Sequence, residues 1–216
     1  MTLQSVRAEI AKACQAAVRA PESVTLVAVS KSQPISAIEA ALQEGQRVFG
    51  ENKVQEAETK FPALRKKYPD IELHCIGHLQ TNKVKIAVGI FDVIETVDRT
   101  SLAEALAIEM KRQHRFLPCF VQVNTGEEPQ KGGIAPRDLP ALLYVCRDAG
   151  LRIEGLMCIP PVDDTADKHF LLLRKLADEV GLAKLSMGMS ADFMTAIRYG
   201  TTHVRVGSAI FGERNF

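Results

Sequence analysis

Short apolar runs and helix-like segments alternate along almost the whole chain. The apolar or β-branched runs occupy residues 25–30, 47–49, 72–76, 91–95, 119–123, 153–159, 184–186 and 203–206. Segments with helical spacing of apolar residues lie before and between them, at 3–19, 36–44, 53–67, 82–88, 101–113, 139–149, 167–180 and 192–199. Alternation of this kind predicts parallel strands joined by right-handed helical crossovers.

An open doubly wound sheet and a closed barrel both produce this pattern, so the choice depends on the number of units and on length. About eight βα units in 216 residues fit the compact end of the barrel range. No Pro/Gly/Ser-rich linker divides the chain. We therefore predict an α/β fold, a single (β/α)8 TIM-type barrel domain over residues 1–216. The extra N-terminal helix is expected to take the place of the missing last barrel helix.

Composition excludes several classes of partner. Lys plus Arg number 27 against 26 for Asp plus Glu, so a formal charge of +1 gives no general attraction for nucleic acid or an anionic membrane. No apolar stretch approaches the roughly 20 residues that span a bilayer. The five cysteines are widely spaced without a CxxC pair, which indicates reduced thiols in a cytoplasmic protein. The five histidines show no metal-ligand spacing, so no metal site is predicted.

Two glycine-bearing turns lie close together near the C-terminal end of the chain. Gly188 with Ser190 forms one turn, and Gly207 with Ser208 forms the next. Small residues let the backbone approach a ligand, and a helix that starts just afterwards directs unpaired N–H groups at it. In eight-stranded barrels the loops after the last two strands frequently hold phosphate. The segment therefore predicts a phosphate site.

Lys31 directly follows the wholly apolar first strand, which places its ammonium group at the barrel mouth. Partial desolvation there would lower its pKa and expose a nucleophilic amine, as in lysines that form Schiff bases. A lysine solvated at a strand end is the simpler alternative. Together with a phosphate site on the same mouth, however, the amine fits an aldehyde that carries a phosphate, either pyridoxal phosphate or a sugar phosphate.

Several motifs carry a family resemblance that covers nearly the whole chain. They are VSKSQP (29–34), FGENKVQE (49–56), IGHLQTNK (76–83), KGGI (131–134), GLMCIPP (155–161), LSMGMSADF (185–193) and HVRVGSAIFGER (203–214). In this order and spacing, they resemble the pyridoxal phosphate homeostasis proteins, the YggS/PROSC-like family. That family is similar in fold to the N-terminal barrel domain of alanine racemases. The resemblance implies a single barrel with pyridoxal 5′-phosphate, abbreviated PLP, at its mouth.

The resemblance also implies roles for individual residues. Lys31 matches the lysine that holds the cofactor as an internal aldimine, and Arg205 matches the arginine that faces the pyridine nitrogen. Asn52 lies where the family lines the ring, and His78 is a looser candidate for the same wall. The matching phosphate positions are Ser190, Gly207 and Ser208, with the backbone of Met189 beside them. Position 53 is lysine where this family often has an aromatic residue, and we expect Lys53 to be solvated at a helix start.

Some of these residues also have purely structural interpretations. Ser190 is a possible N-cap of the following helix, and Arg205 a possible partner for Glu51 or another carboxylate inside the barrel. The histidines at strand starts, His74 and His203, are predicted to be structural. We expect the remaining two, His114 and His169, at the surfaces of helices.

Arg205 also bears on the function. A permanently charged donor keeps the pyridine nitrogen unprotonated and weakens the ring as an electron sink. The first hypothesis is therefore a non-catalytic PLP carrier or buffer that affects amino-acid and keto-acid metabolism indirectly. It would be monomeric and would meet PLP-dependent apo-enzymes transiently. The alternatives are a PLP-dependent amino-acid racemase of low activity and a cofactor-free Schiff-base aldolase that acts on a sugar phosphate.

Overall fold

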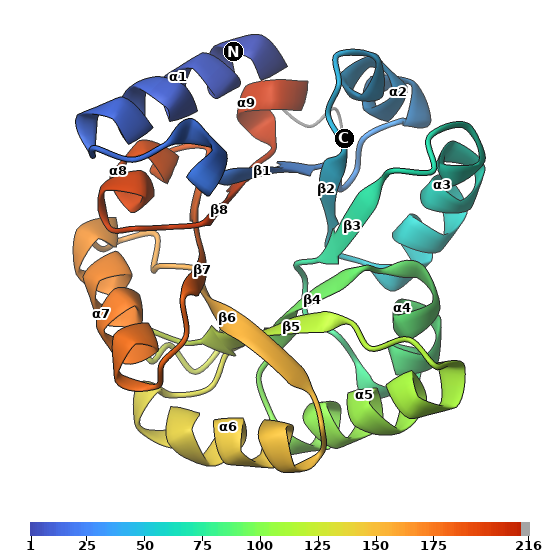
Figure 1. Ribbon diagram of the computed structural model, residues 1–216, viewed down its shortest axis with the longest axis vertical. Helices are drawn as coiled ribbons and strands as arrows, with labels where there is room; N and C mark the ends of the chain where they lie inside the picture. Colours follow the sequence, from blue (N-terminus) through green and yellow to red (C-terminus); the bar gives the residue numbers. More distant parts are fainter. Residues whose placement is uncertain (213–216) are drawn as a thin grey trace.

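A computed structural model, which describes residues 1–212, forms a closed barrel of parallel strands (Figure 1). In chain order they are β1 (Thr25–Val29), β2 (Val48–Glu51), β3 (Glu72–Cys75), β4 (Val93–Val97), β5 (Pro118–Val123), β6 (Arg152–Cys158), β7 (Lys184–Met189) and β8 (His203–Val206). The barrel closes between β1 and β8, where Thr25 pairs with His203 and Ala28 with Val206. The predicted barrel is confirmed.

The helices form a ring outside the strands (Figure 1). They are α1 (Leu3–Ala16), α2 (Ile35–Gln43), α3 (Val54–Lys67), α4 (Val84–Ile90), α5 (Thr100–Gln113), α6 (Leu139–Asp148), α7 (Ala166–Glu179), α8 (Phe193–Arg198) and α9 (Ser208–Phe211). Each helix from α2 to α8 follows the strand before it in the chain and leads to the next. Within residues 1–212, none of these helices combines the length and apolar character needed to cross a bilayer.

The N-terminal helix α1 lies where a long eighth barrel helix would pack. Val6, Ile10 and Cys14 of α1 are buried against Phe193 and Ile197 of α8, in a cluster that also includes residues of β8. Up to residue 212, the segment after β8 forms the short helix α9, and α1 lies beside α8 and α9 in Figure 1. The expected replacement of the last barrel helix by the N-terminal helix is confirmed.

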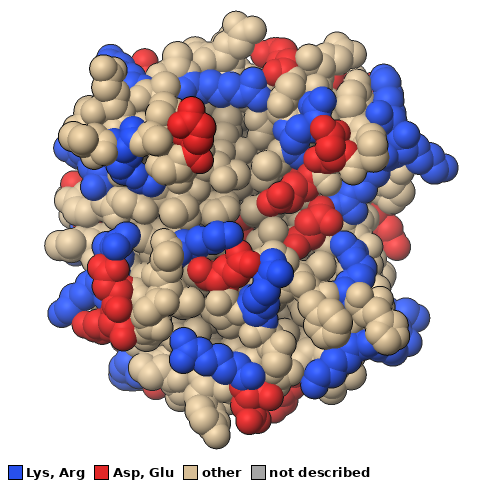
Figure 2. Space-filling model, in the orientation of Figure 1, with Lys and Arg blue, Asp and Glu red and all other residues tan. Residues whose placement is uncertain are grey.

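Alternation along the strands divides the buried side chains into two layers. On β3, Leu73 and Cys75 belong to the large apolar cluster between strands and helices, whereas His74 between them belongs to the barrel interior. Charged side chains of both signs are interspersed over the face of the molecule seen in Figure 2. This mixed surface agrees with the near-zero net charge of the sequence.

Two predictions about local structure are wrong. The seventh strand does not end at residue 186, because β7 continues to Met189, which pairs with Arg205 after an irregularity in register. Gly188 has a φ of +94° within that strand, so its turn-like signal marks a distortion of the strand. His169 does not lie on the surface of its helix. It is 4% exposed, and its Nε2 lies 3.1 Å from Asp164 Oδ2.

Candidate functional site

A cavity of about 320 Å³ opens at the C-terminal ends of the strands. Its walls come from the ends of β1, β2, β3, β6, β7 and β8 and from the segments that follow them. All seven residues predicted to hold the cofactor line it, namely Lys31, Asn52, Met189, Ser190, Arg205, Gly207 and Ser208. The cavity therefore brings together residues that lie far apart in the sequence, from the first strand to the last.

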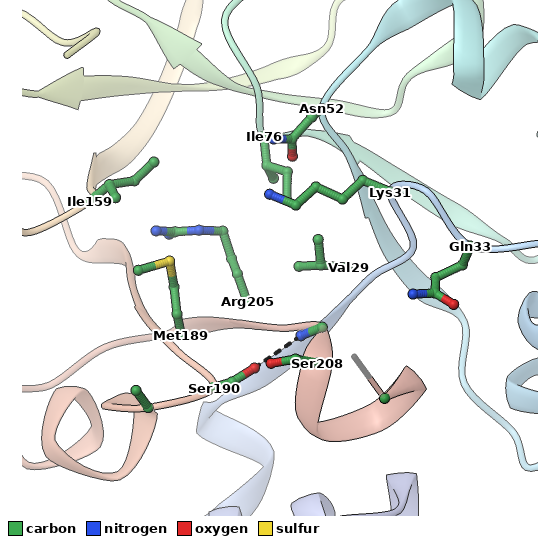
Figure 3. Close-up of a pocket in the computed structure, with 13 residues that line it drawn as sticks. Val29, Lys31, Gln33, Asn52, Ile76, Ile159, Met189, Ser190, Arg205 and Ser208 are labelled. Atoms are coloured by element: carbon green, nitrogen blue, oxygen red, sulfur yellow. Dashed lines mark hydrogen bonds between the residues drawn. The ribbon is translucent and has the colours of Figure 1, made fainter. Parts of the chain in front are cut away.

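Lys31 follows β1 by two positions, and its side chain extends into the cavity (Figure 3). The next residue, Ser32, has a φ of +60°, which is the left-handed region that non-glycine residues rarely adopt. The chain therefore turns sharply just after Lys31. This turn separates the lysine from the helix α2 that follows.

The turns after β7 and β8 are joined directly. Ser190 Oγ accepts a hydrogen bond of 3.3 Å from the backbone N–H of Gly207, drawn as a dashed line in Figure 3. Asp192, not Ser190, is the N-cap residue of α8, and its Oδ1 accepts a hydrogen bond of 2.6 Å from the N–H of Met189. The interpretation of Ser190 as a simple helix cap is therefore wrong.

Gly207, in the turn after β8, and Gly188, within β7, both lie where a side chain would be crowded. A Cβ atom at Gly207 would lie 3.2 Å from the carbonyl oxygen of Val29, which is tight. A Cβ atom at Gly188 would lie 2.6 Å from the Cβ of Ala196 in α8. Gly207 therefore allows the end of β8 to approach the end of β1, and Gly188 allows β7 to approach α8. Serine hydroxyls and the first N–H groups of α9 provide hydrogen-bond donors suited to an anion.

Arg205 rises from β8 into the same cavity, although it is only 4% exposed. Its Nη1 donates a hydrogen bond of 2.6 Å to Ser186 Oγ, and its Nη2 donates one of 2.7 Å to the carbonyl oxygen of Cys158. Figure 3 shows the guanidinium group and the Lys31 amine both directed into the middle of the cavity. The alternative pairing with Glu51 is wrong, because Glu51 bonds to Ser30 and Lys60.

A polar network continues from Arg205 into the barrel interior. Ser186 Oγ donates a hydrogen bond of 2.5 Å to Glu95 Oε2, and Glu95 Oε1 lies 2.5 Å from Nδ1 of His74. The other ring nitrogen of His74 lies 2.7 Å from Glu72 Oε1. Arg205 is therefore coupled to a buried carboxylate through one hydroxyl group.

Charge in this network is set by competition between burial and pairing. Burial alone would lower the pKa of His74, but hydrogen bonds to Glu72 and Glu95 outweigh it and raise that pKa to about 9. Burial would likewise raise the pKa of Glu95, but His74 and Arg205 lower it to about 2. For the nearby His203, burial dominates and lowers the pKa to about 4. At neutral pH His74 is charged and His203 is neutral.

Two residues discussed from the sequence lie beside the cavity. His78, whose side chain is 59% exposed, lines a neighbouring pocket together with Lys53, Lys83 and Asn52. Lys53 is exposed at the N-cap of α3, as expected for a lysine solvated at a helix start. Asn52 belongs to both pockets and so forms part of the wall between them.

Sequence reasoning missed the apolar side of the cavity. Val29, Ile76 and Ile159 line it, and each is at or directly after the end of a strand. Gln33 also lines it, two residues beyond Lys31. The last apolar residue of each strand is the signal that identifies the first three, since strand ends converge on the mouth of a barrel.

Metal-binding groups and tyrosines are the two remaining features to consider near the cavity. Within residues 1–212, no group of three or more His, Cys, Asp or Glu side chains is arranged to hold a metal ion. The described lining of the cavity includes no tyrosine. Tyr144, in α6, is 72% exposed, and Tyr68 and Tyr199 directly follow α3 and α8. A tyrosine base at this mouth is therefore not part of the described arrangement.

Comparison with known proteins places these features in a family. Residues 1–215 match the family model of the alanine racemase N-terminal domain. A pyridoxal phosphate homeostasis protein of Aquifex aeolicus is 39% identical over 99% of this chain and 97% of its own length.

Solved structures show the same barrel. PipY of Synechococcus elongatus PCC7942, solved with PLP bound, has a TM-score of 0.84 and 39% identity over 94% of this chain and all of its own. An alanine racemase of Clostridium difficile 630 has a TM-score of 0.69 at 15% identity over 96% of this chain and 56% of its own. The second likeness is one of fold alone.

Proposed function

Because the chain belongs to the family of pyridoxal phosphate homeostasis proteins, we propose that it binds PLP in the cavity at its barrel mouth. The observation that carries this proposal is the meeting, in one cavity, of the Lys31 amine and the joined turns of Ser190 and Gly207. An amine beside an anion cradle suits an aldehyde that carries a phosphate. The PLP bound to the related PipY supports the same choice of ligand.

The proposed roles are those that the family resemblance implies, and all the residues concerned line the cavity. Lys31 would hold the cofactor by condensation of its Nζ amine with the aldehyde carbon, with the aldehyde oxygen lost as water. Ser190, Ser208 and the backbone at Met189 and Gly207 hold the phosphate. Arg205 would hold the ring at its nitrogen.

Asn52, which directly follows β2, would line the ring. When bound, the cofactor supplies an electrophilic carbon and an electron-withdrawing ring.

We propose that bound PLP is carried or buffered and does little catalysis. Hydrogen bonds to Ser186 and to the carbonyl oxygen of Cys158 hold Arg205, so the position of its guanidinium group in the cavity is fixed. A guanidinium group at the ring nitrogen leaves that nitrogen unprotonated, which weakens stabilisation of a carbanion. Racemisation also needs a second base, and the described lining places no tyrosine there.

The proposal extends to the oligomeric state, the partners and the cellular location of the protein. The chain of 216 residues acts as one cofactor-binding domain, as a monomer that delivers PLP to apo-enzymes during transient encounters. Amino-acid and keto-acid metabolism is affected indirectly through those enzymes. All five cysteines are free thiols, which suits the reducing cytoplasm.

Titration with PLP tests the proposal. Wild-type protein is expected to develop a visible absorption band that saturates at one equivalent, whereas Lys31→Ala develops none. The loaded protein is then incubated with enantiopure amino acids. Racemisation at roughly one turnover per second or faster would contradict the carrier function and favour an amino-acid racemase. A wild-type protein that gains no visible band would contradict PLP binding itself.

A further inference from the structure

An ion pair on α3 lies against the turn that carries Lys31. Glu56 and Lys60 are one helical turn apart, and Lys60 Nζ lies 2.5 Å from Glu56 Oε1. The Lys60 side chain is 10% exposed and that of Glu56 is 22% exposed. Neither residue is among the described lining of the cavity. The pair therefore lies behind the cavity wall, on the helix side of the strands.

Each member of the pair holds the backbone on one side of Lys31. Lys60 Nζ donates a hydrogen bond of 3.0 Å to the carbonyl oxygen of Ser30. Glu56 Oε1 accepts one of 2.5 Å from the backbone N–H of Ser32. Because Ser30 and Ser32 are the neighbours of Lys31, the two contacts fix the chain immediately before and after it.

A buried carboxylate strengthens the hold on Ser30. Glu51 Oε1 accepts a hydrogen bond of 2.7 Å from Ser30 Oγ and lies 3.3 Å from Lys60 Nζ. Burial raises the pKa of Glu51, while Ser30 and Lys60 act in the opposite direction. Lys60 thus contacts two carboxylates and one carbonyl group at the same point.

The conformation of the turn shows why such a hold matters. Ser32 has a φ of +60°, a conformation that costs a non-glycine residue free energy and persists only where surrounding contacts impose it. The hydrogen bond from the Ser32 N–H to Glu56 is a contact of that kind. Without this hydrogen bond, the φ of Ser32 would relax toward a more favourable value. The Lys31 side chain would then move with the turn.

We propose that Glu56 and Lys60 are positioning residues for Lys31, which aim its amine at the cofactor aldehyde through the backbone of Ser30 and Ser32. This inference rests on the proposed function, since it assigns to Lys31 the bond to PLP. The pair itself does not touch the cofactor. It raises the rate at which the Lys31–PLP bond forms, because that rate depends on the orientation of the amine.

The test separates bond formation from binding. The apo-forms of wild type, Lys60→Met, Glu56→Ala and Lys60→Arg are mixed with PLP, and the rate of adduct formation is followed by visible absorbance and by borohydride trapping. Binding without bond formation is measured with pyridoxamine 5′-phosphate, which has the same ring and phosphate but no aldehyde. Thermal unfolding of each apo-protein gives its stability.

Arg65→Met is the matched control. Arg65 is also a cation on α3, donates to the carbonyl of Ile90 and pairs with Asp92, but it contacts the β3–β4 side of the barrel. Its loss removes comparable contacts from the same helix without touching the turn of Lys31.

The proposal predicts that Lys60→Met and Glu56→Ala slow adduct formation about tenfold or more, while the affinity for pyridoxamine 5′-phosphate changes less than about twofold. Lys60→Arg restores part of the rate, and Arg65→Met keeps the wild-type rate at a similar loss of stability. Adduct formation at the wild-type rate in both α3 variants would overturn the proposal.

Parallel loss of rate and of pyridoxamine 5′-phosphate affinity, matched by Arg65→Met, would overturn it as well, because it would show a general structural effect. If Lys60→Met does not fold, the rate of adduct formation and the pyridoxamine 5′-phosphate affinity of Glu56→Ala test the proposal on their own. A wild-type protein that binds neither compound would contradict the proposed function, and this result is distinct from every failure of the positioning role.

Discussion

Ser186 Oγ accepts a hydrogen bond of 2.6 Å from Nη1 of Arg205, so a single hydroxyl group connects the cavity to the interior of the barrel. The same hydroxyl donates to Glu95, whose other oxygen lies beside the ring of His74. The charge of Arg205 is thus fixed by a network that reaches well below the cavity.

Substitution of His74 is expected to be strongly destabilising. His74 is fully buried between Glu72 and Glu95, so His74→Gln leaves a buried carboxylate without its charged partner. Loss of one partner of a buried pair typically costs about 3–5 kcal/mol, which urea unfolding at pH 7 measures. The exposed His78→Gln serves as control and should change the free energy of unfolding by less than about 0.5 kcal/mol. Equal small effects of both substitutions would contradict a charged His74.

The same residue predicts how stability depends on pH. The pKa of His74 is raised from 6.5 to about 9 in the folded protein, so its stabilisation is complete below pH 6.5 and is lost as pH rises through 9. The difference in free energy of unfolding between wild type and His74→Gln should therefore shrink by about 3 kcal/mol from pH 6 to pH 10. A difference that stays constant over this range would show that His74 is neutral when folded.

Gly188 is expected to matter for both stability and ligand binding. Gly188→Ala forces a φ of +94° on an alanine and brings its Cβ within 2.6 Å of Ala196 in α8. Gly150→Ala is the control, since Gly150 has a φ of +84° and a Cβ atom there would have no neighbour within 4 Å. Both should lose about 1–2 kcal/mol from backbone strain, and Gly188→Ala should lose more because of its contact with Ala196, as measured by thermal unfolding.

Only Gly188→Ala should also weaken PLP binding, by about tenfold, because the start of α8 and the turn of Ser190 must move. Equal PLP affinity in the two variants would show that the turn of Ser190 does not contribute to the phosphate site.

The thiols give a prediction that is independent of the cofactor. All five cysteines are buried, and burial raises the pKa of Cys75 and of Cys158 to about 12 and that of Cys146 to about 11. Buried, protonated thiols react slowly with disulfide reagents. Native protein should therefore release almost no thionitrobenzoate in the minutes during which denatured protein releases five equivalents. Rapid reaction of several thiols in the native state would show that the helix layer opens readily.

Much of the barrel and the cavity was predictable from sequence. The alternation of runs predicts the strands, and strand ends of a barrel converge on one mouth, so Lys31 and Arg205 were expected to meet. The roles assigned to Asn52 and to the phosphate residues stay predictions, although all of them line the cavity. Glu213 and Arg214 of the last family motif lie outside the described residues.

The errors have physical causes. Gly188 has the composition of a turn but lies within β7, because the register irregularity there lets the strand continue to Met189. Glu51 was considered a partner of Arg205, yet its neighbour Gly50 faces Val27 and Ile76 in the barrel interior, which directs Glu51 to the opposite side.

The Glu56–Lys60 contacts with the turn of Lys31 were not predictable. They join a helix to a turn more than twenty residues earlier in the chain. No local pattern predicts such a pairing, because it depends on how α3 packs against β1 and β2.

The central claim is that Lys31 holds PLP, and borohydride trapping with peptide mapping tests it most directly. The loaded protein is reduced, digested and analysed by mass spectrometry, with Lys31→Arg as control. The account predicts one pyridoxyl group on the peptide that contains Lys31, and no specific label in the variant. A label found mainly on Lys53 or another lysine, with Lys31 unmodified, would contradict it.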